Sequence, residues 1–346
     1  MGEHEITTAG PLLAARDWLR KPRLREPGWA REPLLAFDPE GAGGALFRQF
    51  RLKQWDYYGI WTPDLYLSAS IAHVGYIGMA FVYAMDLASG RNPERTVIRP
   101  LGRGIAMPRD GEVGDLVFEG DGLRVELRVA PGERRVRAID ARFDGGAGLE
   151  IDATLARPPE HESIVTATPF ASGGFFYNRK LNCLPASGSV RIGSRQVALH
   201  PDTCLGQLDW GRGVWPYRSD WVWASANGFL PDGRRAGLNL GYLGDHRAAA
   251  ENALILDGRV HKIGWVDAQF DPRDYRKPWR FSDREGRLDV ELLPSAERIA
   301  RTNALVLRSE VHQCFGTFRG RALADGGETI AIEALPGFAE EHHARW

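Results

Sequence analysis

The chain has 346 residues, of which 43% are hydrophobic and 26% charged, and its formal net charge is -1. These values are typical of a soluble globular protein and leave room for one large domain or two smaller ones. The near-neutral charge argues against nucleic acid as a partner, because phosphate binding needs a basic excess.

Residues 1–40 are rich in Pro and Arg and lack a regular apolar pattern, so we expect an irregular N-terminal strap. Near-alternation of apolar and polar residues over 46–55 then predicts a half-buried strand. The apolar run 71–88 is interrupted by His73 and Asp86, which argues against stable insertion into a membrane.

Short strand-like runs fill the rest of the chain, and turn signals rich in Gly, Asp and Pro separate them. In the first half these runs are 65–72, 76–86, 97–98, 117–119, 123–129, 136–143 and 149–154. In the second half they are 164–168, 175–181, 187–192, 196–199, 219–226, 236–241, 252–256, 259–265, 279–282, 288–293, 304–312, 315–323 and 329–335. The pair Asp257-Gly258 predicts a two-residue hairpin, whereas helical periodicity is confined to 202–208 and 337–346.

This pattern, together with 40 Gly and 21 Pro, predicts an all-β protein with few short helices. We expect two antiparallel β-barrel or sandwich domains packed together, an N-terminal one over 41–160 and a C-terminal one over 165–346. The Pro-rich segment 158–162 is the expected linker between them.

The cysteines predict a reducing environment. Cys183, Cys204 and Cys314 are far apart and form no CxxC pair, so they provide no disulfide framework. The first ten residues include Glu3 and Glu5 and lack the apolar core of a signal peptide. We therefore expect a cytoplasmic protein.

Residues 208–223 hold four of the 11 tryptophans together with two Asp and two Arg. Trp and Tyr combine a large apolar body with a polar tip, and buried charges need partners. The mixture predicts either the wall of a pocket or a rigid corner between two sheets, and both interpretations stay open. The candidate ligand-binding residues in this stretch are Trp210, Arg212, Trp215, Tyr217, Trp221 and Trp223.

Asp209 is the candidate proton donor within this stretch. A carboxyl group that protonates carbon needs a raised pKa, and an aromatic surround with little water raises it. Neighbouring tryptophan faces would also stabilise a carbocation. The alternative is an ion pair between Asp209 and Arg212 that only holds a turn, and the sequence leaves both possibilities open.

Glu310 and His312 are a second candidate acid–base pair, because residues two apart on a strand share one face. They fit equally well as a buried structural pair. Asn178, Lys180 and Asn239 are polar residues within apolar strands. Buried amides need hydrogen-bond partners, which either a substrate or a neighbouring strand provides.

Motifs for metals and nucleotides do not occur in the sequence. There is no HxH, HExxH or CxxC pattern, so we expect no metal site. The sequence Gly211-Arg212-Gly213 lacks the strand–GxGxxG–helix setting of a phosphate loop, and no Ser lies in a GxSxG elbow. We therefore expect no cofactor.

Several phrases together resemble one family of bacterial and eukaryotic proteins. They are FFYNRKL at 175–181, LDWGRGVWPY at 208–217, GLNLGY at 237–242, ENA at 251–253, HK at 261–262, KPW at 277–279, SEVHQCFG at 309–316 and GFAEE at 337–341. In this combination the chain resembles the family catalogued as domain of unknown function 2804. The resemblance covers nearly the whole chain and is strongest from residue 175 to the end.

More distantly, the chain is similar to proteins with paired lipocalin-like (calycin) barrels, such as carotenoid hydratase, isoflavonoid hydratases and tocopherol cyclase. That similarity implies two lipocalin-like barrels and a hydrophobic substrate handled without a redox cofactor. Some of these proteins use an Asp near Trp and Tyr to protonate an alkene. The Asp209-Trp210 and Asp220-Trp221 pairs are the candidate equivalents, by analogy.

We therefore expect a cofactor-independent acid–base enzyme of the hydratase, lyase, isomerase or cyclase type that acts on a hydrophobic small molecule. Two alternatives remain, a lipocalin-like lipid or isoprenoid carrier and a glycan-active enzyme with paired carboxylates. The sequence indicates no oligomeric state. The regions around Asp209, Glu310–His312 and Asn178–Lys180 are predicted to converge on one cavity.

Overall fold

The structure is a computed structural model that describes residues 3–14, 21–243, 249–304 and 307–346. Parts of the predicted strap, at 1–2 and 15–20, and residues 305–306 of the predicted strand 304–312 lie outside the described residues. Strands make up 61% of the protein, which confirms the all-β prediction. The helical elements of the described residues are the 3-10 turn η1 (Pro39–Ala42), α1 (Ala45–Arg51) and α2 (Phe143–Gly146).

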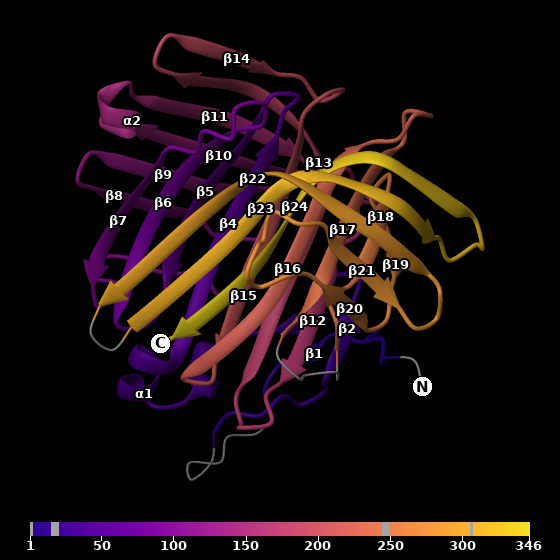
Figure 1. Ribbon diagram of the computed structural model, residues 1–346. Helices are drawn as coiled ribbons and strands as arrows, with labels where there is room; N and C mark the ends of the chain where they lie inside the picture. Colours follow the sequence, from indigo (N-terminus) through magenta and orange to yellow (C-terminus); the bar gives the residue numbers. More distant parts are fainter. Residues whose placement is uncertain (1–2, 15–20, 244–248, 305–306) are drawn as a thin grey trace.

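Ten antiparallel strands form a nearly closed barrel from the first two thirds of the chain (Figure 1). Their spatial order is β7-β6-β5-β4-β15-β13-β11-β10-β9-β8. The bounds are β4 (Leu52–Trp61), β5 (Leu65–His73), β6 (Ile77–Asp86), β7 (Glu94–Pro100), β8 (Leu116–Gly120), β9 (Leu123–Ala130), β10 (Glu133–Asp140), β11 (Leu149–Ala156), β13 (Phe175–Ile192) and β15 (Leu205–Val214). The remaining strands flank the barrel and are β1 (Gly10–Pro11), β2 (Gly28–Ala30), β3 (Leu35–Ala36), β12 (Ile164–Pro169) and β14 (Arg195–Leu199).

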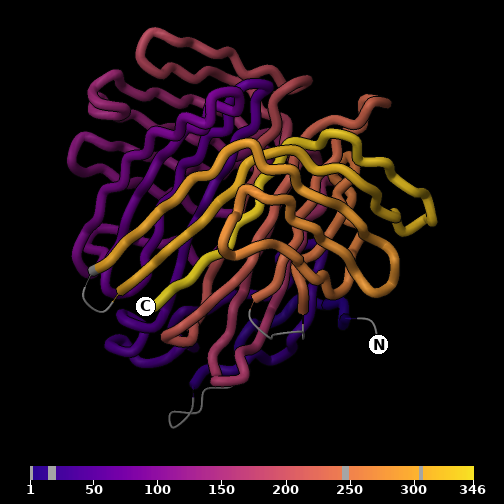
Figure 2. Tube along the Cα trace, in the orientation of Figure 1, coloured from indigo at the N-terminus to yellow at the C-terminus, as the bar shows by residue number. Residues whose placement is uncertain are grey.

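The last third of the chain forms a nine-stranded antiparallel half-barrel, in the order β19-β18-β17-β16-β24-β23-β22-β21-β20. The bounds are β16 (Arg218–Phe229), β17 (Arg235–Leu243), β18 (Ala253–Leu256), β19 (Arg259–Lys262), β20 (Val266–Gln269), β21 (Trp279–Asp283), β22 (Leu288–Ala304), β23 (Leu307–Leu323) and β24 (Thr329–Arg345). The three long strands β22, β23 and β24 pass across the β4–β6 side of the barrel, as the tube in Figure 2 shows.

Aromatic rings join the two sheets. Trp61 of β4 stacks on Phe338 of β24 with ring centroids 6.3 Å apart, and Tyr66 of β5 lies 5.2 Å from Phe315 of β23. Large rings bury much apolar area and hold defined relative orientations. The barrel and the half-barrel each contain a core of their own, so this aromatic layer is a third core between them.

The change from one sheet to the other falls between Val214 and Arg218. It does not coincide with the expected linker at 158–162, because β12, β13 and β15 pair within the first sheet. These pairings join residues far apart in the chain, such as β15 with β4, and sequence spacing does not reveal them.

Local predictions were partly correct. Residues 45–51 form α1 rather than a strand, and Leu46 is 75% exposed. The predicted tail helix at 337–346 is wrong, because these residues continue β24 in pairing with β16 and β23. The hairpin at Asp257-Gly258 is confirmed, since both residues have the positive φ that its tight turn needs.

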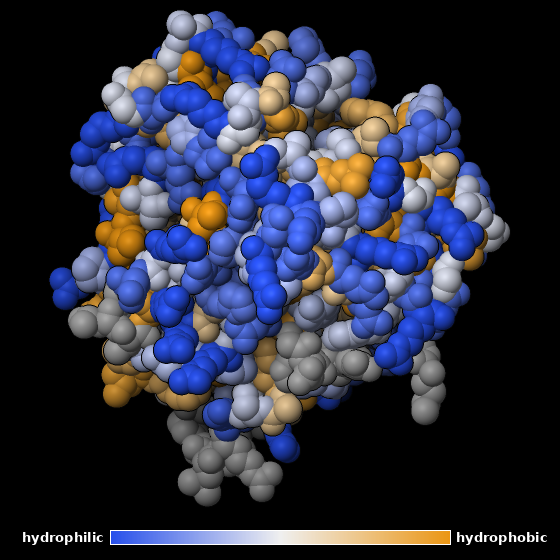
Figure 3. Space-filling view, in the orientation of Figure 1, coloured by the Kyte–Doolittle hydropathy of each residue, from blue (hydrophilic) through white to orange (hydrophobic). Residues whose placement is uncertain are grey.

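The exterior is mainly polar. Hydrophilic side chains dominate the face drawn in Figure 3, with small apolar patches between them. None of the helices in the described residues has the length and apolar content to cross a membrane.

Candidate functional site

A cavity of about 250 Å³ lies between the barrel and the half-barrel. Its walls come from the outer face of β4–β6, β13 and β15 and from the facing side of β16, β17 and β22–β24. Aromatic rings dominate the lining and include Trp55, Tyr57, Phe176, Trp215, Trp221 and Trp223. A largely apolar cavity with a few polar groups is the usual form of a small-molecule site.

Strand alternation decides which residues of β15 reach this cavity. Asp209 lies on the outer face and lines the cavity, whereas Trp210 faces the barrel interior. Gly211 lies on the same face as Asp209, and the indole of Trp55 covers it closely. A Cβ at Gly211 would come within 2.4 Å of that ring. Glycine therefore lets Trp55 lie against the strand and form the cavity wall.

Lys180 and two carboxyl groups form the acidic end of the cavity. Lys180 on β13 lies directly opposite Asp209 on β15, and its Nζ is 2.9 Å from Asp209 Oδ1. The same Nζ lies 3.6 Å from Glu251 Oε1 and 4.1 Å from the centroid of the Trp223 ring. Burial opposes the ammonium form, but the two carboxylates outweigh it and raise the pKa of Lys180.

Two asparagines position this end without lining the cavity. The side-chain amide of Asn178 donates to Glu251, and its oxygen accepts from the hydroxyl of Thr166 at 2.5 Å. Asn239 accepts from the Trp223 indole at 2.9 Å and donates to the backbone oxygen of Glu251 at 2.7 Å. Both were predicted to bind substrate, and the structure instead gives them supporting contacts.

Glu340 of β24 is a further buried acid in the cavity wall. Burial raises its pKa to about 7, and the nearby Asp209 adds to the shift, while Arg298 and Lys180 oppose it. The carboxyl accepts a hydrogen bond at 3.1 Å from Gln313. Sequence reasoning missed Glu340 because its segment was assigned to a helix. Alternation along β24 from buried Phe338 would have placed Glu340 on the cavity side.

A network of hydrogen-bonded side chains orients Gln313, the residue that donates to Glu340. The oxygen of Gln313 accepts from Tyr83 at 2.9 Å and from Arg298 at 3.4 Å. Tyr83 and Tyr66 each hydrogen-bond Tyr57, at 2.8 and 2.5 Å. This network crosses from the half-barrel into the barrel, so Gln313 is held in one orientation with its amide group toward Glu340.

The rest of the Trp-rich stretch is divided between two faces. Trp215, Trp221 and Trp223 line the cavity. Arg212 points into the barrel, where it pairs with Asp56 at 2.8 Å and lies over Trp210. The alternative Asp209–Arg212 pair does not form, because residues three apart on a strand face opposite sides.

Tyr217, the remaining residue predicted in this stretch, is 45% exposed and is not among the lining residues. It lies in the short connection between β15 and β16, where neither strand directs its ring into the cavity.

Glu310 and His312 meet each other but lie outside the cavity. His312 Nε2 is 3.4 Å from Glu310, and its Nδ1 is 2.7 Å from Glu297. Val311 and Gln313 of β23 line the cavity, so Glu310 and His312, which alternate with them along the strand, face outward. The predicted convergence therefore holds for Asp209 and Lys180 and is wrong for this pair.

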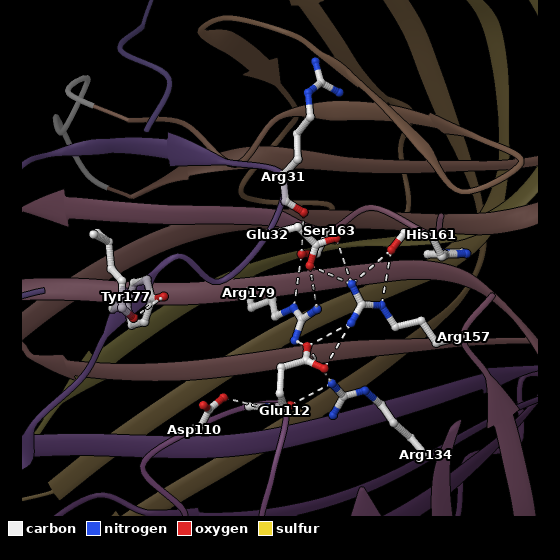
Figure 4. Close-up of polar contacts among 12 residues, drawn as sticks. Arg31, Glu32, Asp110, Glu112, Arg134, Arg157, His161, Ser163, Tyr177 and Arg179 are labelled. Carbon is white, nitrogen blue, oxygen red and sulfur yellow. Dashed lines mark hydrogen bonds and ion pairs between the residues drawn. The ribbon is translucent and has the colours of Figure 1, made fainter. Parts of the chain in front are cut away.

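A second buried ionic cluster lies at one end of the barrel (Figure 4). The guanidinium groups of Arg134, Arg157 and Arg179 converge on Glu112 and Glu32. Arg157 binds both carboxylates, at 3.0 and 2.7 Å. These pairs join the loop before β8 and the N-terminal segment to the barrel, and the two carboxylates occupy the space between the arginines.

No group of three or more His, Cys, Asp or Glu is placed to hold a metal ion in the part of the chain that the structure describes. The site is thus an aromatic cavity between two β-sheets, and its charged groups among the described residues are Glu94, Lys180, Asp209, Glu251, Arg298, Arg308 and Glu340. The protein is therefore a paired-sheet β protein with an acidic cavity between its two sheets.

The family model described as domain of unknown function DUF2804 matches residues 3–346, and the chain belongs to that family. No curated protein matches the sequence. An AttH-like protein of Nitrosomonas europaea is 17% identical, with a TM-score of 0.50 over 90% of this chain and 98% of the other, and thus shares the fold. Kievitone hydratase of Nectria haematococca is 13% identical, with a TM-score of 0.45 over 88% and 92%.

Proposed function

We propose that the protein is an acid–base enzyme of the hydratase, lyase, isomerase or cyclase type that transforms a hydrophobic small molecule in this cavity without a cofactor. The observation that carries the proposal is the buried carboxyl group of Glu340, whose pKa of about 7 lets it give and take a proton near neutral pH. A carboxyl group with an ordinary pKa would have lost its proton under these conditions.

The surrounding groups suit a proton transfer to carbon. Glu340 would donate its proton to a double bond, which leaves a carbocation on the substrate and a carboxylate on Glu340. The faces of Trp221 and Trp223 would stabilise that cation. The cation would then lose a neighbouring proton to Asp209, or it would bond to a water molecule that gives one of its protons to Asp209. Asp209 is placed to accept a proton because its side chain lines the same cavity, 2.9 Å from the ammonium of Lys180.

Exchange of hydrogen with the solvent tests this proposal without knowledge of the substrate. Purified protein is incubated in D₂O with a panel of apolar alkenes, ketones and alcohols, and mass spectrometry records the uptake of deuterium. We expect at least one compound to gain deuterium, and we expect Asp209→Asn to abolish this gain while preserving the shape of the cavity.

Exchange at the wild-type rate in Asp209→Asn would remove Asp209 from the mechanism. A panel in which compounds bind but none exchanges would contradict the enzyme proposal. That second outcome would favour a carrier of hydrophobic molecules.

A further inference from the structure

The acidic end of the cavity holds more negative than positive groups. Among the residues that the structure describes, Asp209 and Glu251 share a single cation, Lys180, which lies closer to Asp209 than to Glu251, at 2.9 against 3.6 Å. Burial raises the pKa of Glu251, and Asp209 raises it further, while Lys180 offsets part of the effect. Glu251, whose side chain is 18% exposed, is therefore a mostly buried carboxyl group that shares its counter-ion with Asp209.

The other charged groups that line the cavity in the described part of the chain do not correct this imbalance. Arg298 is bound to Glu94 at 2.6 Å, and it also acts on Glu340, a third carboxyl group close to Asp209 and Lys180. Arg308 is 58% exposed and pairs with Glu310 on the outer surface. Burial lowers the pKa of His342 to about 3, so this ring is neutral.

Asp209 also has an unused oxygen. Its Oδ1 lies 2.9 Å from the ammonium of Lys180 as an ion pair, but this buried atom receives no hydrogen bond from any of the described residues, and Asp209 is only 7% exposed. Asp209 lines the cavity, as do the ring of Trp223 and the stacked rings of Tyr242 and Trp265 near Glu251. Carboxylates combined with aromatic faces are the groups that bind organic cations in proteins.

We propose that this end of the cavity binds the protonated nitrogen of an otherwise apolar ligand, with Glu251 as its main counter-ion and the carboxyl group of Asp209 as a hydrogen-bond acceptor. Such a site would give the proposed enzyme a substrate class. It rests on the proposed function only in that both use the same cavity. An apolar amine would place its rings against Trp55, Trp215 and Trp221.

Three probes with the same ring system separate charge from shape. Naphthylmethylamine, naphthylmethanol and naphthoic acid are titrated into the protein by calorimetry at neutral pH. Because only the amine supplies a positive charge to Glu251, we expect it to bind about tenfold more tightly than the alcohol. We expect the acid to bind most weakly, since its carboxylate meets two others.

Variants identify the group responsible for this preference. Glu251→Gln is expected to reduce amine binding to the level of the alcohol and to leave alcohol binding unchanged. Glu340→Gln is expected to keep the preference for the amine, although it removes the proposed proton donor. Glu310→Gln, on the outer face, serves as the matched control and should change neither affinity.

The proposal is overturned if the alcohol binds as tightly as the amine, if no probe binds, or if Glu251→Gln retains the preference. In the first case deuterium exchange that depends on Asp209 and Glu340 would still support the proposed enzyme, acting on a neutral substrate. If the amine binds preferentially but no compound of the panel gains deuterium, the enzyme proposal is contradicted and the cation site remains.

Discussion

Replacement of Glu340 by glutamine is expected to slow proton exchange by about 10²- to 10⁴-fold, the usual contribution of a positioned general acid. Glutamine keeps the size of the side chain and cannot give up a proton to a substrate. In the wild-type protein the rate should fall as the pH rises through about 7, because Glu340 then loses its proton. This decline should be absent from the residual activity of Glu340→Gln.

Glu341→Gln is the matched control, one residue away on the opposite face of β24. Glu341 hydrogen-bonds Tyr275 on the outer side of the half-barrel and does not line the cavity. It should keep the wild-type rate and pH profile. If Glu340→Gln exchanges protons at the wild-type rate, or if both variants lose activity equally, Glu340 is not the proton donor.

Replacement of Arg212 by alanine is expected to lower the free energy of unfolding by about 3–5 kcal/mol. Arg212 is fully buried in the barrel, where its guanidinium pairs with Asp56 and donates to the backbone oxygens of Trp55 and Pro108. Its removal leaves the Asp56 carboxylate and these oxygens without their donor. Urea unfolding followed by tryptophan fluorescence measures the loss.

Two further variants separate the ion pair from general packing. Arg191→Ala removes an arginine that is half exposed and paired with Glu150, and should cost less than about 1 kcal/mol. Adding Asp56→Asn to Arg212→Ala should restore part of the loss, because no unpaired charge remains. A loss of less than about 1 kcal/mol for Arg212→Ala would show that the buried pair contributes little to stability.

The fold class followed from the sequence because its signals are local. Short apolar runs between Gly, Asp and Pro turns indicate antiparallel strands. The pair Asp257-Gly258 determines a hairpin through its own backbone conformation, without contacts from distant residues. The strand predicted from residue 46 was wrong over 46–51, because the seven-residue surface helix α1 has no buried stripe that would reveal it. Pairing of β15 with β4 joins segments about 150 residues apart, and this contact depends on the whole barrel.

The site was partly predictable for the same reason. The composition of 208–223 indicated a pocket wall, and alternation assigns Asp209 to one face and Arg212 to the other. Alternation also places Glu310 beside His312, but only packing against the barrel decides that their face is the outer one. Glu251 belonged to the phrase ENA at 251–253 that carries the family resemblance, but nothing placed it in the cavity, because it precedes β18 outside any strand pattern.

The protonation of Glu340 tests the account most directly, and its measurement needs no substrate. Carbon-13 NMR of protein labelled at the glutamate carboxyl groups follows each titration, and the spectrum of Glu340→Gln assigns the signal. We predict a midpoint at about pH 7 for Glu340, because burial disfavours its carboxylate. A midpoint at about 4.3, the value for a glutamate in water, would contradict the proposal that this cavity contains an acid ready to donate at neutral pH.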